Sequence, residues 1–155
     1  MKLLHVVLVE PEIHWNTGNA GRTCLAADAQ LHLVAPLGFS LDDKNVRRAG
    51  LDYWPRVHPR LWGTWAELEA ALPSLGTPFF FSARGRRPFQ EVAYPRPAVL
   101  IFGRESVGLP GELLDRWADA TVAIPMRDPE VRSLNLSTSV ALGAYEVRRQ
   151  WGWGV

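Results

Sequence analysis

The sequence is poor in the residues that build disulfide-linked or metal-bound scaffolds. Its 155 residues contain one cysteine, Cys24, and four histidines that form no Cys/His cluster. A single cysteine excludes an internal disulfide framework and is typical of a reducing compartment, so we expect a cytoplasmic protein. The lack of a Cys/His cluster argues against a structural zinc site, and we expect no metal.

Long apolar runs are also missing. No run approaches the roughly 20 residues that a membrane-spanning helix needs, so we expect no membrane partner. The apolar start, Leu3–Val9, leads into Glu10 and Glu12 without a small-residue cleavage site, which favours a first strand over a signal peptide. The length predicts a single domain over residues 1–155, and the hydrophobic share of 47% is ordinary for a globular protein.

Lysine is nearly absent, although basic residues as a group are not. The chain has 15 arginines and two lysines, and its net charge is only +1. Arginine binds phosphate in bidentate fashion better than lysine does, although genome base composition or heat adaptation can produce the same excess. The local clusters at Arg47–Arg48 and at Arg84, Arg86 and Arg87 favour a surface that faces RNA.

The apolar residues that are present predict an α/β fold. Continuous apolar runs predict strands at 3–9, 30–34, 53–57, 78–82, 97–102 and 119–124. Such runs are typical of a parallel sheet that is buried on both faces. Cap residues predict helices from Ser40 to Gly50, from Thr64 to near Pro73 and from about Gly111. This alternation of strands and helices predicts a layered α/β fold.

Three segments repeat one layout, in which a strand, a polar loop and a helix start follow one another. They contain NTGNAGR at 16–22, FGRESVGLP at 102–110, and IPM followed by RSLNLS within 124–137. Ligands of α/β proteins bind beyond the carboxyl ends of the strands, so we expect the site there. The segments lack both the Gly-Lys-Ser/Thr of a phosphate-binding P-loop and a GxGxxG, which argues against an ordinary nucleotide-binding domain.

Taken together and in this order, the three motifs resemble the SPOUT class of RNA methyltransferases, in its 2′-O-ribose branch. The resemblance covers nearly the whole chain. It is closest to the small enzymes that methylate the wobble cytidine or uridine of tRNA, and EPEI, DDK and RRAGLDY look like them too. It implies a parallel-sheet fold with a C-terminal trefoil knot, a homodimer, a tRNA anticodon stem-loop as partner, and S-adenosylmethionine (SAM) as cofactor, with S-adenosylhomocysteine as its product. Methylation at another tRNA or rRNA site and a non-catalytic RNA-binding role are the alternatives.

The resemblance also implies roles for individual residues. Catalytic roles fall on Asn16, Arg22 and Ser137. Contacts with the substrate RNA fall on Arg22, Arg47, Arg48, Arg84 and Tyr145. The implied cofactor site contains Phe81, Ser82, Gly103, Glu105, Gly108, Ile124, Met126, Ser133, Leu134 and Asn135.

Several of these roles have alternatives. A guanidinium with a pKa above about 12 rarely releases its proton, so we interpret Arg22 as a cation that stabilises an alkoxide rather than as a base; a plain surface charge is the other reading. Glu105 could fix its loop or balance the charge of the sulfonium, and Tyr145 could be a core aromatic. Cys24 lies in an apolar helical setting, which favours a buried, inert thiol over a nucleophile.

Three positions depart from the pattern of the small wobble enzymes. His14, Trp15 and Arg104 stand where those enzymes more often have proline. These changes fall in the loops that would meet substrate. At the carboxyl end, Trp151 and Trp153 are predicted to lie at a symmetric subunit interface.

Overall fold

The computed structural model describes residues 1–42, 44 and 53–154. Its elements, in chain order, are β1 (Leu4–Val9), α1 (His14–Ala27), β2 (Ala29–Val34), α3 (Trp54–Val57), β3 (Arg60–Trp62), α4 (Trp65–Leu75), β4 (Thr77–Phe81), β5 (Arg87–Pro88), η2 (Phe89–Glu91), β6 (Ala98–Phe102), α5 (Gly111–Arg116), η3 (Ala118–Ala120), β7 (Thr121–Ala123) and α6 (Leu136–Trp151).

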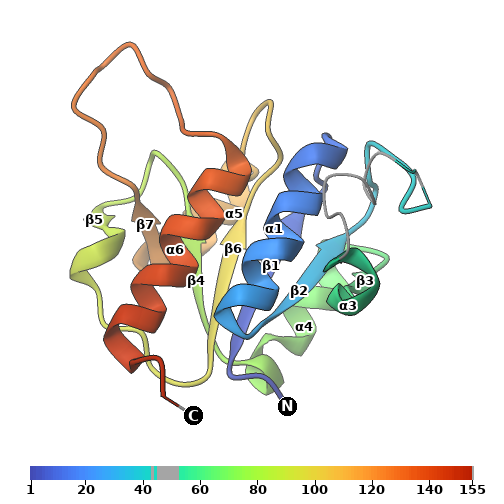
Figure 1. Ribbon diagram of the computed structural model, residues 1–155. Helices are drawn as coiled ribbons and strands as arrows, with labels where there is room; N and C mark the ends of the chain where they lie inside the picture. Colours follow the sequence, from blue (N-terminus) through green and yellow to red (C-terminus); the bar gives the residue numbers. More distant parts are fainter. Residues whose placement is uncertain (43, 45–52, 155) are drawn as a thin grey trace.

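The strands form one seven-stranded sheet in the order β3-β2-β1-β6-β4-β7-β5. Every pairing is parallel. The predicted parallel α/β sheet is therefore confirmed. Because all strands run the same way, their carboxyl ends meet at one edge of the sheet, which is the upper edge in Figure 1.

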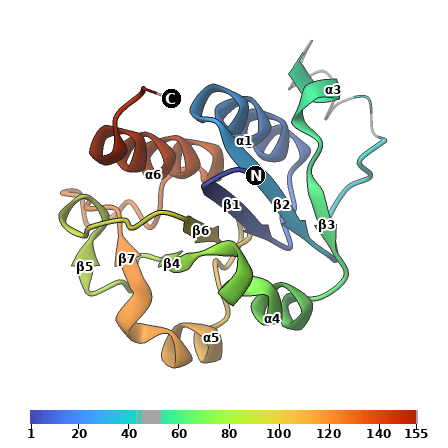
Figure 2. The same ribbon diagram turned by 90° about the horizontal axis from the view of Figure 1, so that it is seen from below.

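Helices cover both faces of this sheet. Figure 2 shows α1 and α6 on one face and α4 and α5 on the other. Each face has its own apolar core, with Val140 and Ala144 of α6 in the first and Leu68 and Leu72 of α4 in the second. Every residue of β1 and β6 is buried, which explains why these strands read as continuous apolar runs.

The predicted strand at 53–57 is wrong. This run forms the single-turn helix α3, in which Pro55 occupies the first turn, and only Val57 is buried. Proline lacks the N–H that a strand ladder needs but suits a helix start. The edge strand β3 comes three residues later and has only three residues, of which Leu61 is 60% exposed. The helix predicted from Ser40 to Gly50 lies largely outside the described residues.

The cap chemistry predicted for α4 is confirmed. The side chain of Thr64 accepts a hydrogen bond from the backbone N–H of Glu67 at 3.2 Å, and the Glu67 carboxylate accepts one from Gly63 N at 3.0 Å. The helix continues through Pro73 to Leu75. None of the helices in the described part of the chain has the length and hydropathy needed to cross a bilayer.

Candidate functional site

Three loops at the carboxyl edge of the sheet enclose one cleft of about 610 Å³. They follow β4, β6 and β7, which are neighbours around β4 in the sheet, and Figure 1 shows them rising from the same edge. All ten residues predicted to bind cofactor line this cleft, namely Phe81, Ser82, Gly103, Glu105, Gly108, Ile124, Met126, Ser133, Leu134 and Asn135. Asn16 and Arg84 line it as well. Residues far apart in the sequence are thus brought together at the predicted place.

Glu105 fixes its loop to the start of α1. Its carboxylate accepts hydrogen bonds from the backbone N–H groups of Glu12 and Ile13 at 2.8 and 3.0 Å, and from Asn16 Nδ2 at 3.0 Å. The helix has no capping side chain of its own at Ile13, and a carboxylate from a distant motif instead accepts the N–H of this N-cap residue and that of the residue before it. Of the roles considered for Glu105, loop fixation is the one that these contacts support.

Asn16 joins the first motif to the third. It is buried, and its Oδ1 accepts a hydrogen bond from Asn135 Nδ2 at 3.0 Å. Asn135 caps α6, because its Oδ1 accepts a hydrogen bond from Thr138 N at 3.2 Å. The Ser137 hydroxyl donates to the same oxygen at 2.6 Å. Both amide groups of Asn16 and Asn135 are held in one orientation, and the three motifs form one connected network.

A second link joins the first motif to the second. The Glu12 carboxylate accepts a hydrogen bond from Ser106 N at 2.8 Å. The hydrogen bonds from Ser106, together with the nearby Arg104 guanidinium, hold the pKa of Glu12 below its ordinary value. The carboxylate is therefore charged at neutral pH and holds the loop after β6 at a second point.

Gly103 and Gly108, in the loop after β6, are both needed for the backbone conformation of that loop. A Cβ on Gly103 would lie 2.2 Å from the backbone of Gly108, and Gly108 N donates to Arg104 O at 2.8 Å. Gly108 has a φ of 72°, in the left-handed region that favours glycine. Both glycines are therefore needed to form the tight turn from Gly103 to Gly108.

Three predicted site residues lie outside the cleft of their own chain. Arg22 is exposed on α1, and its guanidinium lies over the ring of Tyr53, 5.0 Å from the centroid. Ser137 touches the site only through Asn135. Tyr145 is 46% exposed, so the core alternative for it is wrong. Arg47 and Arg48 lie outside the described residues.

Sequence reasoning missed several residues that line the cleft. Among them are Ile13, Ala83, Arg104, Ser106, Val107, Leu109, Arg132 and Ser139. Arg104 and Arg132 carry charge, and each sits inside a motif, directly beside a predicted cofactor residue. Their position in the motifs was a usable signal. Cys24 is buried, and burial raises the pKa of its thiol to about 12, so the interpretation as an inert core thiol is confirmed.

This fold and its three-loop cleft define a class of RNA-modifying enzymes. The sequence model of the SpoU rRNA Methylase family matches residues 3–145, and the chain belongs to this family. More specifically, it is 45% identical over 153 residues to the tRNA (cytidine(34)-2′-O)-methyltransferase of Burkholderia cenocepacia, covering 97% of both chains. It is likewise 45% identical over 153 residues to the enzyme of the same name from Burkholderia pseudomallei.

Solved structures agree with this assignment. One, from work on the 2-OH methylation of C/U34 on tRNA, is 47% identical, covers 97% of both chains and gives a TM-score of 0.91. Another, an AdoMet-bound rRNA methyltransferase from Sinorhizobium meliloti, is 26% identical and gives a TM-score of 0.82, with 96% of this chain matching 57% of that one. The family predicted from the three motifs is confirmed.

Proposed function

We propose that this protein is a SAM-dependent methyltransferase that acts on the ribose 2′-hydroxyl of the wobble nucleotide, cytidine or uridine, in a tRNA anticodon loop. The observation that carries the proposal is 45% identity over 97% of both chains to an enzyme of that name. The cleft built by all three motifs supports it, since every predicted cofactor residue lies on one surface. A cytoplasmic location accords with a tRNA substrate and with a single, buried thiol.

The residues of the cleft fit the cofactor. Phe81, Ile124 and Leu134 offer apolar surface for an adenine ring, and the ends of β4, β6 and β7 offer backbone donors and acceptors beside it. A cleft of about 610 Å³ lies within the usual range for small-molecule sites. SAM would supply an electrophilic methyl group on a sulfonium. The network around Glu105 and Asn16 keeps the surrounding loops in place, which favours a preformed site.

The ribose hydroxyl needs help because it is a weak nucleophile. We assign Arg22 to bind the phosphate beside it and to stabilise the developing alkoxide. Arg22 is exposed and free of a carboxylate partner among the described residues, so its guanidinium is available to an incoming phosphate. Its position outside its own cleft points to a site completed by a second subunit.

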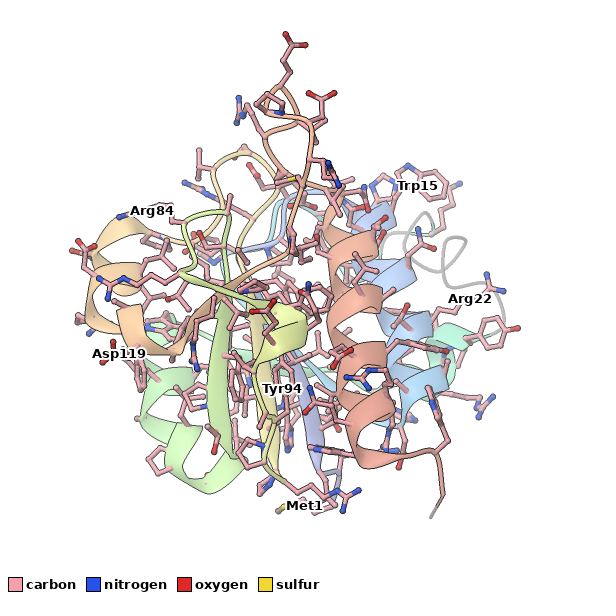
Figure 3. All side chains as sticks on the ribbon, turned by 90° about the vertical axis from the view of Figure 1, so that its left-hand side faces the viewer. Met1, Trp15, Arg22, Arg84, Tyr94 and Asp119 are labelled. Carbon is pink, nitrogen blue, oxygen red and sulfur yellow. The ribbon has the colours of Figure 1, made fainter. Side chains whose placement is uncertain are left out.

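We propose that this second subunit docks on the face formed by α1 and α6. The two helices pack side by side. Four of the ten exposed large hydrophobic side chains in the described part of the chain belong to them or to the tail: Trp15, Leu142, Tyr145 and Trp153. Exposed apolar patches of this kind mark interfaces, and Figure 3 shows Trp15 and Arg22 projecting on the same side.

Of the two tryptophans predicted at the interface, only Trp153 is free to lie there. Trp153 is 56% exposed, and its ring centroid lies 5.0 Å from that of Tyr145. Trp151 instead donates its indole N–H to Tyr94 O at 2.7 Å and stacks under Arg96 and Arg148. It therefore ties the end of α6 to its own subunit.

We also propose the trefoil knot implied by the family. The segment between β4 and β6 passes outside β7 as β5 before it returns. It then meets the end of α6, where Gln150 Nε2 donates to Val92 O at 2.9 Å. The segment between β4 and β6 would thus form a loop. The C-terminal chain, which runs from β7 to α6, would pass through this loop and complete the knot.

The direct test of the function is methylation by the purified protein. Labelled SAM and bulk tRNA, followed by nucleoside analysis, should yield 2′-O-methylcytidine or 2′-O-methyluridine at the wobble position. Methylation of rRNA or of another tRNA site would support the first alternative. Cofactor and RNA binding without any methylated product would support the non-catalytic alternative.

Arg22→Ala tests the mechanism within that assay. We expect SAM affinity to stay nearly unchanged and turnover to fall by about two orders of magnitude or more, the effect of losing one aimed electrostatic group, about 3 kcal/mol. Arg22→Lys should recover only part, because an ammonium cannot reproduce the planar fork. Arg60→Gln, at an exposed arginine of the edge strand β3, is the matched control. Near wild-type turnover of Arg22→Ala would remove Arg22 from the active site.

A further inference from the structure

Three arginines from three different loops converge on the cleft. Arg84 follows β4, Arg104 follows β6, and Arg132 lies between β7 and α6, and all three line the same cavity. The single acidic residue among the described lining residues is Glu105, whose two oxygens already accept three hydrogen bonds. The mouth of the cleft therefore carries an excess of positive charge.

The cofactor does not account for this charge. SAM has a sulfonium, an ammonium and one carboxylate, so its net charge at neutral pH is positive, and three guanidiniums around it are electrostatically unfavourable overall. Phosphodiester groups, by contrast, are the ligands that guanidiniums recognise in bidentate fashion. The surplus charge therefore fits the RNA backbone on either side of the reacting ribose.

Arg104 is the best placed of the three. Arg84 has a carboxylate partner, Asp115, at 3.4 Å. Arg104 forms no ion pair within 4.0 Å among the described residues, and its acidic neighbour Glu12 already accepts a hydrogen bond from Ser106 N. Its backbone is fixed on both sides, because Gly108 N donates to Arg104 O at 2.8 Å and the next residue, Glu105, is bound to α1. An exposed guanidinium on a fixed backbone is well suited to capture a ligand with little loss of backbone entropy.

We infer that Arg104 is an RNA-positioning residue, which binds a phosphate next to the target nucleotide at the mouth of the cleft. This inference rests on the proposed function. Arg104 would act on the binding of RNA and not on the methyl group, which separates its role from that of Arg22.

The test measures RNA affinity as a function of salt for Arg104→Gln, with an anticodon stem-loop as the probe. A lost phosphate contact on a single-stranded loop should reduce the slope of log K against log salt by about 0.7. Affinity at low salt should fall about tenfold, the effect of one charge-assisted hydrogen bond. Arg104→Lys should keep the slope and lose part of the affinity. Arg60→Gln, away from the cleft, should change neither quantity.

Calorimetry with S-adenosylhomocysteine provides the second readout. Arg104→Gln should bind it as the wild type does, and saturating RNA should restore most of the turnover. An unchanged salt slope for Arg104→Gln would overturn the inference, and so would a loss of cofactor affinity, which would place Arg104 at the cofactor carboxylate. If the wild-type protein itself neither binds nor methylates the stem-loop, the proposed function fails instead, and the two failures are thus distinguishable.

Discussion

His5 and His32 form a hydrogen-bonded pair in the core, and Trp62 fixes the positions of their protons. The indole N–H of Trp62 can only donate, so His32 Nδ1 must accept it, at 3.0 Å. The His32 proton is then on Nε2 and is donated to His5 Nδ1, at 2.9 Å. A second proton on His32 would oppose the indole N–H. Both imidazoles are therefore neutral in the folded protein.

This pair predicts a loss of stability in mild acid. Burial, and then the neighbouring His5 and Arg60, lower the pKa of His32 to about 3, and burial lowers the pKa of His5. Because the folded pKa values lie below the unfolded value near 6.5, the stability present above pH 6.5 is lost as pH falls towards 3. His32 alone should cost about 2 kcal/mol between pH 7 and pH 5, and His5 adds to this loss in the same direction.

Urea unfolding at both pH values would measure this loss. His32→Gln removes the titrating group with the larger pKa shift, so it should lower stability at pH 7 but clearly reduce the loss between pH 7 and pH 5. The exposed His58 provides the control: His58→Asn suits its left-handed φ of 48° and should keep the full pH dependence. Equal losses in His32→Gln and wild type would show that the pair does not govern acid stability.

At the scale of elements, the start of α1 depends on a side chain from another motif. Glu105→Gln replaces two carboxylate oxygens, which accept three hydrogen bonds, with one oxygen and an NH₂ group that faces donors. A donor that loses its partner costs about 1–3 kcal/mol when it is buried, and the cost is smaller here because two of these donors are part-buried and the third is exposed. We expect a matching fall in the free energy of unfolding and weaker binding of S-adenosylhomocysteine. Glu112→Gln, at an exposed acid of α5, is the control, and a wild-type result for Glu105→Gln would show that the network is not needed.

The Glu105 contacts at the start of α1 also show which features cannot be predicted from the sequence. Thr64 and Asn135 cap their own helices, and caps of this kind can be predicted from the sequence because the signal lies within three residues. The start of α1 at His14 could not be found that way, because its cap comes from Glu105. Asn16 looked like a loop residue near a helix start, yet it is a buried link within the first turn. Short elements such as α3 and β3 carry too few residues for a pattern to distinguish them.

At the scale of the whole molecule, the cleft was predictable because each lining motif follows a buried parallel strand. Parallel strands end at one edge, so three motifs that each follow a strand must meet there. Arg22 has no such constraint, since it lies on a helix and not at a strand end. The first motif predicts a functional role for Arg22, but nothing in the sequence places Arg22 relative to the cleft. The structure leaves it on the exposed side of α1, outside the lining of the cleft, and the proposed second subunit would bring a cleft towards it.

A composite site built by two subunits makes a sharp prediction about assembly. The protein should sediment at twice its 17.3 kDa chain mass, because the apolar side chains on α1 and α6 need a partner surface. Leu142→Asp should yield monomers, whereas Leu61→Asp, at an exposed leucine on β3, should not. A wild-type mass near that of one chain at micromolar concentration would exclude the dimer.

Mixing two inactive variants would then show whether Arg22 acts across the interface. Arg22→Ala keeps an intact cleft, and Gly103→Val, whose side chain would collide with the backbone of Gly108, keeps an intact Arg22. If each site takes its cleft from one subunit and Arg22 from the other, a mixed dimer contains one site with both parts intact. Random exchange should then restore about a quarter of wild-type turnover. If Arg22 serves the cleft of its own chain, every site in every dimer carries one of the two lesions, and the mixture should stay as inactive as its components.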